Sequence, residues 1–152
     1  MRRMLRYHPL VMSSRADDRV DAVIRSAGLK VTRQRRAIFR VLSTAADHPD
    51  ANEIHRRAQA LDPSVSVATT YRTLAALSDK GVVNRLTFEG ATSRFETTDA
   101  PHHDHIVDLD SGEVIEFVSA EIERLQRQIA ERHGYEIVSH RLELYCRKRR
   151  SR

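Results

Sequence analysis

The sequence predicts an α+β fold, in which an N-terminal winged-helix domain (a helix-turn-helix plus a β-hairpin wing) precedes a small α/β domain. Four amphipathic helical patterns follow one another in the first half of the chain, and two β-like runs come directly after them. The second half combines strand-like runs with one further helical pattern. With 152 residues, 40% of them hydrophobic, the chain has enough apolar material for one domain or two small ones.

Four helices are predicted from apolar residues at the spacing i, i+3, i+4, i+7. Their stripes are Val20-Val23-Ile24-Ala27, Ile38-Val41-Leu42-Ala45, Ala51-Ile54-Ala58-Leu61 and Tyr71-Leu74-Ala75-Ser78. Gly28 is placed to end the first helix and Thr32 to cap the second. Ser64 or Ser66 opens the fourth helix, and Gly81 closes it.

The third and fourth helices are joined by the short turn 62–66, which is the arrangement of a helix-turn-helix. We expect Thr69, Thr70, Arg72 and Thr73 to lie off the buried stripe, near the start of the second helix of this pair. Small hydroxyl side chains allow close approach to DNA, and Arg72 can reach a guanine edge or a phosphate. A plain helical bundle with an ordinary polar surface is the alternative.

The two β-like runs after Gly81 predict a hairpin, which is the wing of a winged helix. They cover residues 82–88 and 93–97, around a turn at 89–92. Arg85 and Arg94 would be its phosphate contacts.

The acidic half is expected to contain two strands and a helix between them. The strand-like runs are 114–117 and 135–146, and His140 lies within the second. Ser119 can cap the helix, and Gly134 stands at its end. Three apolar residues of this helix are expected to point inward, namely Ile122, Leu125 and Ile129.

Charge divides the chain. Residues 1–97 carry 17 Lys+Arg and 10 Asp+Glu, residues 98–146 carry 4 and 11, and residues 147–152 add 5 basic side chains. The basic part therefore suits contact with phosphate, and the acidic part suits cation binding, although two ordinary solvated surfaces would give the same counts.

The run His102-His103-Asp104-His105 predicts metal binding. Successive side chains of an extended segment point to opposite faces, so His102 and Asp104 would face one way and His103 and His105 the other. This spacing offers two pairs of ligands to two different sites, and each pair needs further ligands from elsewhere in the fold. A polar loop without metal is the alternative.

Further ligands are available in both halves of the chain. Glu123 lies on the flank of the predicted helix, His140 and Glu116 lie in strand-like runs, and Glu96 ends the wing. Imidazole and carboxylate donors suit Fe(II), Mn(II), Co(II) or Zn(II) and disfavour Cu(I). Because metal binding requires neutral imidazole, occupancy should fall below about pH 6.

We expect neither a membrane anchor nor a disulfide or cysteine-rich zinc site. No apolar run approaches the roughly 20 residues that a membrane helix needs. The longest near the N-terminus is residues 10–12, too short for an export signal. We therefore expect a soluble, cytoplasmic protein with no membrane partner. Cys146 is the single cysteine, which excludes an internal disulfide and a thiolate-rich zinc site.

From about Asp17 to Tyr145, the chain resembles the ferric uptake regulator (Fur) family of bacterial transcription factors. The resemblance is carried by residues 28–35 (GLKVTRQR), 66–74 (SVATTYRTL), 102–105 (HHDH), 112–117 (GEVIEF), 121–123 (EIE) and 132–134 (RHG). It implies a homodimer in which each subunit has a winged-helix DNA-binding domain and an α/β dimerisation domain, with divalent metal setting the DNA-competent arrangement.

The resemblance also implies roles for individual residues. A site joining the two domains would use His48, Glu96, His103 and His105, with Glu116 as a further candidate, and a site in the dimerisation domain would use His102, Asp104, Glu123 and His140. Lys30 would lie in or near the minor groove, and Tyr71 and Arg72 would contact bases or phosphate. The corresponding domains are an N-terminal extension expected to be flexible (1–14), the winged-helix domain (15–97), the metal-binding dimerisation domain (98–146) and a basic tail (147–152).

One feature departs from the family. Many relatives hold a structural zinc with paired Cys-x-x-Cys motifs, where this chain has Asp108 and Ser111, so a zinc site made of four cysteines is excluded. Glu96 in place of aspartate, and a cluster without cysteine, point away from the peroxide-sensing and zinc-uptake branches. The run at 102–105 also differs from the triple-histidine run of the haem-responsive branch, which leaves the iron and manganese sensors.

We therefore expect a metal-dependent DNA-binding repressor of iron or manganese homeostasis genes, and not an enzyme. Its cofactor would be Fe(II) or Mn(II) in the cell, with Zn(II) or Co(II) binding in vitro. Its partners would be operator DNA and a second copy of the chain, with a tetramer left open. The alternatives are a small metallohydrolase, with Glu116 or Glu123 as general base beside a metal-bound water, and a zinc- or peroxide-responsive regulator of the same family.

Overall fold

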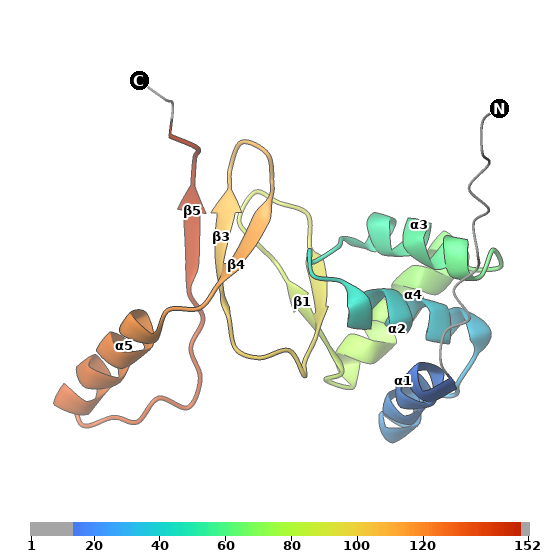
Figure 1. Ribbon diagram of the computed structural model, residues 1–152, viewed down its shortest axis with the longest axis horizontal. Helices are drawn as coiled ribbons and strands as arrows, with labels where there is room; N and C mark the ends of the chain where they lie inside the picture. Colours follow the sequence, from blue (N-terminus) through green and yellow to red (C-terminus); the bar gives the residue numbers. More distant parts are fainter. Residues whose placement is uncertain (1–13, 150–152) are drawn as a thin grey trace, which may run out of the picture.

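The structure is a computed structural model, and it describes residues 14–149. Figure 1 shows a helical half, a β-hairpin in the middle and a second half that contains a sheet and a helix projecting away from it. Residues 1–13 of the predicted N-terminal extension and the last three residues of the basic tail lie outside the described residues. Within the described part, no helix is both long enough and apolar enough to cross a membrane.

The first half contains four helices and a two-stranded hairpin, as the apolar spacing predicts. The elements are α1 (Ser14–Ser26), α2 (Arg33–Thr44), α3 (Ala51–Leu61), α4 (Val67–Asp79), β1 (Val83–Leu86) and β2 (Arg94–Thr97). The strands of the hairpin are antiparallel, with Asn84 opposite Glu96. The fold class is therefore confirmed, and the hairpin stands where the wing was expected.

Side-chain caps explain where three of these helices begin. The hydroxyl of Thr32 accepts from the amide of Arg35 at the start of α2, and Asp50 caps α3 in the same way. Ser66, not Ser64, caps α4 by accepting from the amide of Thr69. These bonds satisfy helix amides that have no partner within the helix, so each fixes a helix start.

The orientation of α4 differs from the prediction. Its buried residues are Thr70, Thr73, Leu74 and Leu77, whereas Tyr71 is 52% exposed. The buried stripe predicted through Tyr71 and Ser78 is therefore wrong: the buried residues lie about one position earlier in the sequence. The threonines were expected at the surface because they are polar, but their small, β-branched side chains fit into the interior when their hydroxyls are bonded.

The second half is a three-stranded sheet in the order β4-β3-β5, with α5 beside it. Its elements are β3 (Asp104–Asp108), β4 (Val114–Phe117), α5 (Ala120–Arg132) and β5 (Glu143–Cys146). β3 pairs antiparallel with β4 and parallel with β5. Ser119 caps α5 as expected. The closing strand is shorter than predicted, because residues 135–142 are not in a strand and His140 precedes β5.

Of the three apolar residues of α5 predicted to point inward, Ile122 is half-buried, and Leu125 and Ile129 are exposed. None of its thirteen residues is buried, and Leu125 and Ile129 are 55% and 48% exposed. The prediction that they face inward is therefore wrong for a single copy of the chain. An exposed apolar helix face of this kind is typical of an interface.

The two halves share a small apolar core. Leu86 and Phe88 of the hairpin are buried together with Val107 of β3, and Ala91 and Val114 pack against them. The predicted domain boundary at residues 97–98 lies between β2 and β3. The turn of the hairpin is consequently packed against the second half rather than extended into solvent.

Candidate metal centres

The run His102–His105 supplies two separate clusters of ligand-type side chains. Among the described residues, one cluster combines His48, Glu96, His103 and His105, and the other combines His102, Asp104, Glu123 and His140. In each cluster the four donor atoms lie within 4.8 Å of one another. The alternation of side chains along an extended segment thus divides the run as predicted.

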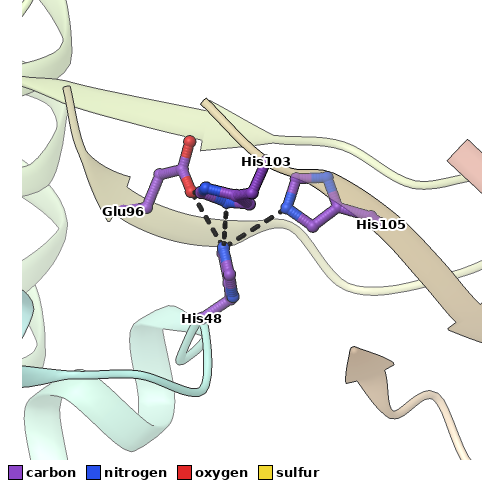
Figure 2. A group of neighbouring side chains, drawn as sticks. All are labelled: His48, Glu96, His103 and His105. Atoms are coloured by element: carbon purple, nitrogen blue, oxygen red, sulfur yellow. Dashed lines mark hydrogen bonds and ion pairs between the residues drawn. The ribbon is translucent and has the colours of Figure 1, made fainter. Parts of the chain in front are cut away.

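The first cluster, which we call the interdomain cluster, converges on His48. Its Nε2 lies 2.8 Å from Oε2 of Glu96 and 3.3 Å from Nε2 of both His103 and His105. Figure 2 shows the ring of His48 pointing at the other three side chains. His103 Nε2 is also 3.1 Å from Oε2 of Glu96.

The four residues come from both halves of the molecule. His48 lies in the loop between α2 and α3, has a φ of +45° and is 3% exposed. Glu96 lies in β2, His103 just before β3, and His105 within β3. A left-handed backbone is uncommon for a residue other than glycine, so the fold holds His48 in a disfavoured conformation at this cluster.

The chemistry of these donor atoms fits a cation. Nδ1 of His103 lies 2.8 Å from the carbonyl oxygen of Pro101, which can only accept. The proton of the neutral ring is therefore on Nδ1, and Nε2 presents a lone pair to the cluster. Wherever no proton bridges them, a carboxylate oxygen and imidazole lone pairs brought this close repel one another, and a cation between them would relieve that repulsion.

The ionisation of the cluster follows from the same contacts. Burial alone would raise the pKa of Glu96, but hydrogen bonds from His48 and Asn84 and the nearby His103 lower it. Burial would likewise lower the pKa of His103, but its bond to Pro101 and the nearby carboxylates raise it. Burial lowers the pKa of His105, and the neighbouring histidines add to that effect, which favours a neutral ring.

Glu116 stands at the edge of the interdomain cluster. Its Oε1 is 3.2 Å from Nδ1 of His48 and 4.0 Å from Nε2 of His103. It therefore approaches the other nitrogen of His48, and the structure does not bring it into the group of four donor atoms. Its side chain is 42% exposed.

The second cluster lies between β3, α5 and the segment before β5. The Nε2 atoms of His102 and His140 are 2.9 Å apart, and Oε1 of Glu123 is 3.4 Å and 3.2 Å from them. Asp104 is 1% exposed, and its Oδ1 has no hydrogen-bond partner among the described residues. A buried carboxylate oxygen without a partner is costly, so this cluster also fits a cation.

The residues predicted to contact DNA divide into an exposed and an internal group. Lys30, Tyr71, Arg72 and Arg85 are exposed, and Thr69 is half-buried. Tyr71 and Arg85 line one groove of about 450 Å³ between α4 and the hairpin. The helix and the hairpin thus offer a common exposed face.

Two predicted DNA contacts are bonded within the chain instead, with Thr70 buried and Arg94 half-buried. Thr70 is fully buried, and its hydroxyl donates to the carbonyl of Ser66 at 3.1 Å. Arg94 donates to the carbonyls of His48 at 3.1 Å and Gly112 at 2.6 Å. Both were expected outside because polar side chains on a helix or a wing are usually solvated, but here backbone carbonyls use their donors.

Sequence reasoning missed Asn84, which donates from Nδ2 to Oε1 of Glu96 at 3.3 Å. The register of the hairpin, which places these two residues opposite each other, would have identified this contact. Phe88 was also missed; its ring meets the ring of His105 at 5.5 Å between centroids. An isolated aromatic residue near a hairpin turn gives no signal that it will be buried.

A hydrogen-bonded turn occupies the position where relatives carry the first Cys-x-x-Cys motif. Ser111 Oγ donates to Oδ2 of Asp108 at 2.8 Å, and the amide of Asp110 donates to Oδ1 at 3.0 Å. These bonds lower the pKa of Asp108. Cys146 is exposed with a free thiol and pairs with Asp108 in the β3–β5 register.

Comparisons with known proteins agree with this geometry. The model of the ferric uptake regulator family matches residues 26–145. The ferric uptake regulation protein of Brucella abortus biovar 1 (strain 9-941) is 52% identical over 128 residues, covering 84% of this chain and 91% of that protein. A structure titled zinc-bound manganese uptake regulator is 44% identical with a TM-score of 0.73, covering 85% of this chain and 98% of that one. The Vibrio cholerae ferric uptake regulator is 40% identical with a TM-score of 0.75, over 84% and 98%.

Proposed function

The chain belongs to the ferric uptake regulator family, and we propose that it represses genes of iron or manganese homeostasis by binding their operator DNA as a metal-loaded homodimer. It is a metal-responsive DNA-binding regulator, and the comparisons give no support to the metallohydrolase alternative. The family consists of transcription regulators, which agrees with the expectation that the chain is not an enzyme.

The observation that carries the proposal is the origin of the interdomain ligands. His48 and Glu96 belong to the half that carries the DNA-binding face, whereas His103, just before β3, and His105, within β3, belong to the other half. A bound cation would supply positive charge and fixed coordination at this junction. Because ligands from both halves must be present together, occupancy favours one relative arrangement of the halves over others.

The donor set is compatible with Fe(II) or Mn(II) as the physiological ion. Both clusters consist of imidazole and carboxylate groups, and the single cysteine lies in neither. Such donors also bind Zn(II) and Co(II), so ligand type alone does not select among these metals. The related structures include a manganese regulator with zinc bound, which agrees with that overlap.

Homodimerisation is supported by the exposed apolar surface of the second half. Leu125 and Ile129 of α5, Ile115 of β4 and Leu144 of β5 are all between 40% and 55% exposed. A face of this kind is costly in water and is buried when a second copy covers it. Two copies would also present two DNA-binding faces, as repeated operator half-sites require.

The DNA-binding face proposed here consists of Lys30, Thr69, Tyr71, Arg72 and Arg85. The first turns of α4 carry three of these residues, which is the part of a recognition helix that meets base edges. Arg85 would contact phosphate from the hairpin. Because phosphate contacts release counterions, affinity should fall steeply as salt increases.

Fluorescence anisotropy tests metal gating directly. The probe is a labelled duplex from the promoter of an iron- or manganese-uptake gene of the same genome, titrated with chelator-treated protein with and without Mn(II). We expect at least about tenfold tighter binding with Mn(II), a typical allosteric coupling. His103→Ala should lose this difference, and His133→Ala, at an exposed histidine outside both clusters, should keep it.

Equal affinity of the wild-type protein with and without Mn(II) would refute gating. The same titration is repeated with Fe(II) and with Zn(II), and each metal's midpoint is compared with its free concentration in the cell. The physiological metal must act at that concentration, so the comparison separates an iron or manganese regulator from a zinc-responsive one.

A further inference from the structure

Arg94 connects the two halves of the molecule through backbone carbonyls. It lies in β2, two residues before Glu96, and its Nη1 donates to the carbonyl of His48 at 3.1 Å. Its Nη2 donates to the carbonyl of Gly112 at 2.6 Å, in the turn between β3 and β4. One guanidinium therefore bonds the loop that carries His48 and the turn that follows β3, the strand that carries His105.

The loop at His48 depends on such support. His48 has a left-handed backbone, which a residue with a side chain adopts reluctantly. The amide of Phe95 donates to the carbonyl of Pro49 at 3.1 Å, and Asp50 forms an isolated bridge with Arg94. β2 thus bonds three consecutive residues of this loop, and the Arg94 guanidinium holds the one whose conformation is least favoured.

The surroundings of Arg94 do not suit a phosphate contact. Both terminal nitrogens already bond carbonyls, and Nε is buried without a partner among the described residues. Arg85, in contrast, is exposed in the groove that Tyr71 also lines. The two arginines of the hairpin therefore have different environments and different roles.

We propose that Arg94 is a positioning residue that holds His48 at the interdomain cluster and binds the hairpin to the β3–β4 turn. It contacts neither DNA nor metal in this role. It sets the metal concentration at which DNA binding begins, because it keeps ligands from the two halves in register before a cation arrives. This role of Arg94 rests on the proposed function.

The test compares Arg94→Gln with Arg85→Gln in the full chain, using the promoter duplex and two readouts. The first is the Mn(II) concentration at which the protein is half-loaded with metal in the absence of DNA, followed by competition with a metal-chelating dye, and the second is the salt dependence of DNA affinity at saturating Mn(II). We expect Arg94→Gln to raise the Mn(II) midpoint about 10- to 100-fold, as loss of a group that orients ligands does. Its salt slope should equal that of the wild type.

The control should behave in the opposite way. Arg85→Gln removes an exposed cation, so it should reduce the salt slope by about one unit per subunit and leave the Mn(II) midpoint unchanged. Arg94→Lys keeps the charge but cannot donate to two carbonyls from a planar fork, so its midpoint should lie more than about threefold above that of the wild type and below that of Arg94→Gln. Far-ultraviolet circular dichroism checks that each variant is folded.

A reduced salt slope for Arg94→Gln with an unchanged midpoint would overturn the positioning role and restore a phosphate contact. Wild-type values for both readouts would overturn both roles. If Arg94→Gln does not fold, Arg94→Lys is decisive alone, and a midpoint within about threefold of wild type, a difference of under 1 kcal/mol in metal binding, contradicts the role. A wild-type protein that ignores Mn(II) would instead reject the proposed function itself.

Discussion

His103 shows how one hydrogen bond can select the atom that faces a metal. The carbonyl of Pro101 accepts a hydrogen bond from Nδ1–H, so Nε2 is left as the atom that faces a metal in the interdomain cluster. The nearby carboxylates of Glu96 and Glu116 raise the pKa of the ring, while burial lowers that of His105. The two histidines of one strand segment therefore respond differently to acid.

This difference predicts the pH dependence of metal binding. The usual pKa of histidine is about 6.5, and a ring with a raised pKa is protonated at a higher pH than this. Protons then compete with the metal for the ring nitrogen. Lowering the pH from about 7.5 to about 6.0 should raise the Mn(II) midpoint for DNA binding about fourfold or more. Titrations at both pH values check this, and a midpoint that does not change with pH would contradict the assignment of His103 as a ligand.

The pair Asp21–Arg36 predicts the pH dependence of stability. Arg36 donates from Nε and Nη2 to the two carboxylate oxygens of Asp21, each at 2.7 Å. Hydrogen bonding to Arg36 lowers the pKa of Asp21, although burial opposes this. A lowered pKa means that the pair stabilises the fold above the usual pKa near 4, and that this contribution disappears as the pH falls through the lowered value.

Asp21→Asn should therefore lower the free energy of unfolding by about 1–2 kcal/mol at pH 7, because Arg36 is partly exposed and solvent weakens the pair. Asp18→Asn, at an exposed position of the same helix, should change it by less than about 0.5 kcal/mol. Urea denaturation followed by circular dichroism at about pH 7, 5 and 3 measures both. The difference between Asp21→Asn and wild type should persist at pH 5 and shrink below pH 4.

At the scale of single elements, α4 combines a stable start with an exposed reading surface. Ser66 caps the helix through the amide of Thr69 at 3.1 Å, and Thr70 and Thr73 fill its buried side. Tyr71 and Arg72 are thereby turned outward. The cap matters for function because the first turn of α4 is part of the proposed DNA-binding face.

Ser66→Ala should cost about 1 kcal/mol of unfolding free energy, since the amide of Thr69 loses its partner. Ser66→Asn, which retains a side-chain acceptor, should stay close to wild type. Denaturant unfolding of the three proteins checks this. Equal stability of Ser66→Ala and wild type would mean that water replaces the cap at no cost.

Elements were predictable where local signals suffice, and less so where they depend on distant contacts. Thr32 and Ser119 mark helix starts by their own chemistry, and both predictions are confirmed. The alternation along residues 102–105 likewise divided the ligands between two clusters. The face of α4 and the burial of Phe88 depend on what other segments place against them, and no local pattern carries that information.

The roles of the two hairpin arginines illustrate the same limit for the site. Arg85 and Arg94 look alike in the sequence, as basic residues on a predicted wing. Their difference arises because residues 86–91 pack against the second half, which brings Gly112 to the guanidinium of Arg94. Among the cluster residues, His48 alone was named only through the family resemblance, since it is more than fifty residues from its partners His103 and His105.

At the scale of the whole molecule, α5 lies far from the helical half (Figure 1). Its residues Leu125 and Ile129 are exposed to solvent. Leu125→Glu would place a charge in the proposed interface. Burying that charge should cost roughly 1.4 kcal/mol or more, so the dissociation constant of the dimer should be at least about tenfold higher than that of the wild type. Arg124→Glu lies off the apolar stripe and should remain dimeric. Sedimentation velocity over a range of concentrations measures this. An unchanged dimer in Leu125→Glu would mean that the subunits meet elsewhere.

The tetrapeptide at 102–105 supplies ligands to both clusters from its two opposite faces. The evolution of one cluster is therefore constrained by the other. Deleting or inserting a single residue ahead of it would shift the register by one, so that each cluster would receive the side chains that now belong to the other. Neither ligand set can therefore change its position in the sequence without the other. Relatives should therefore change these centres by exchanging residue types in place, and seldom by altering the length of the segment that leads into β3.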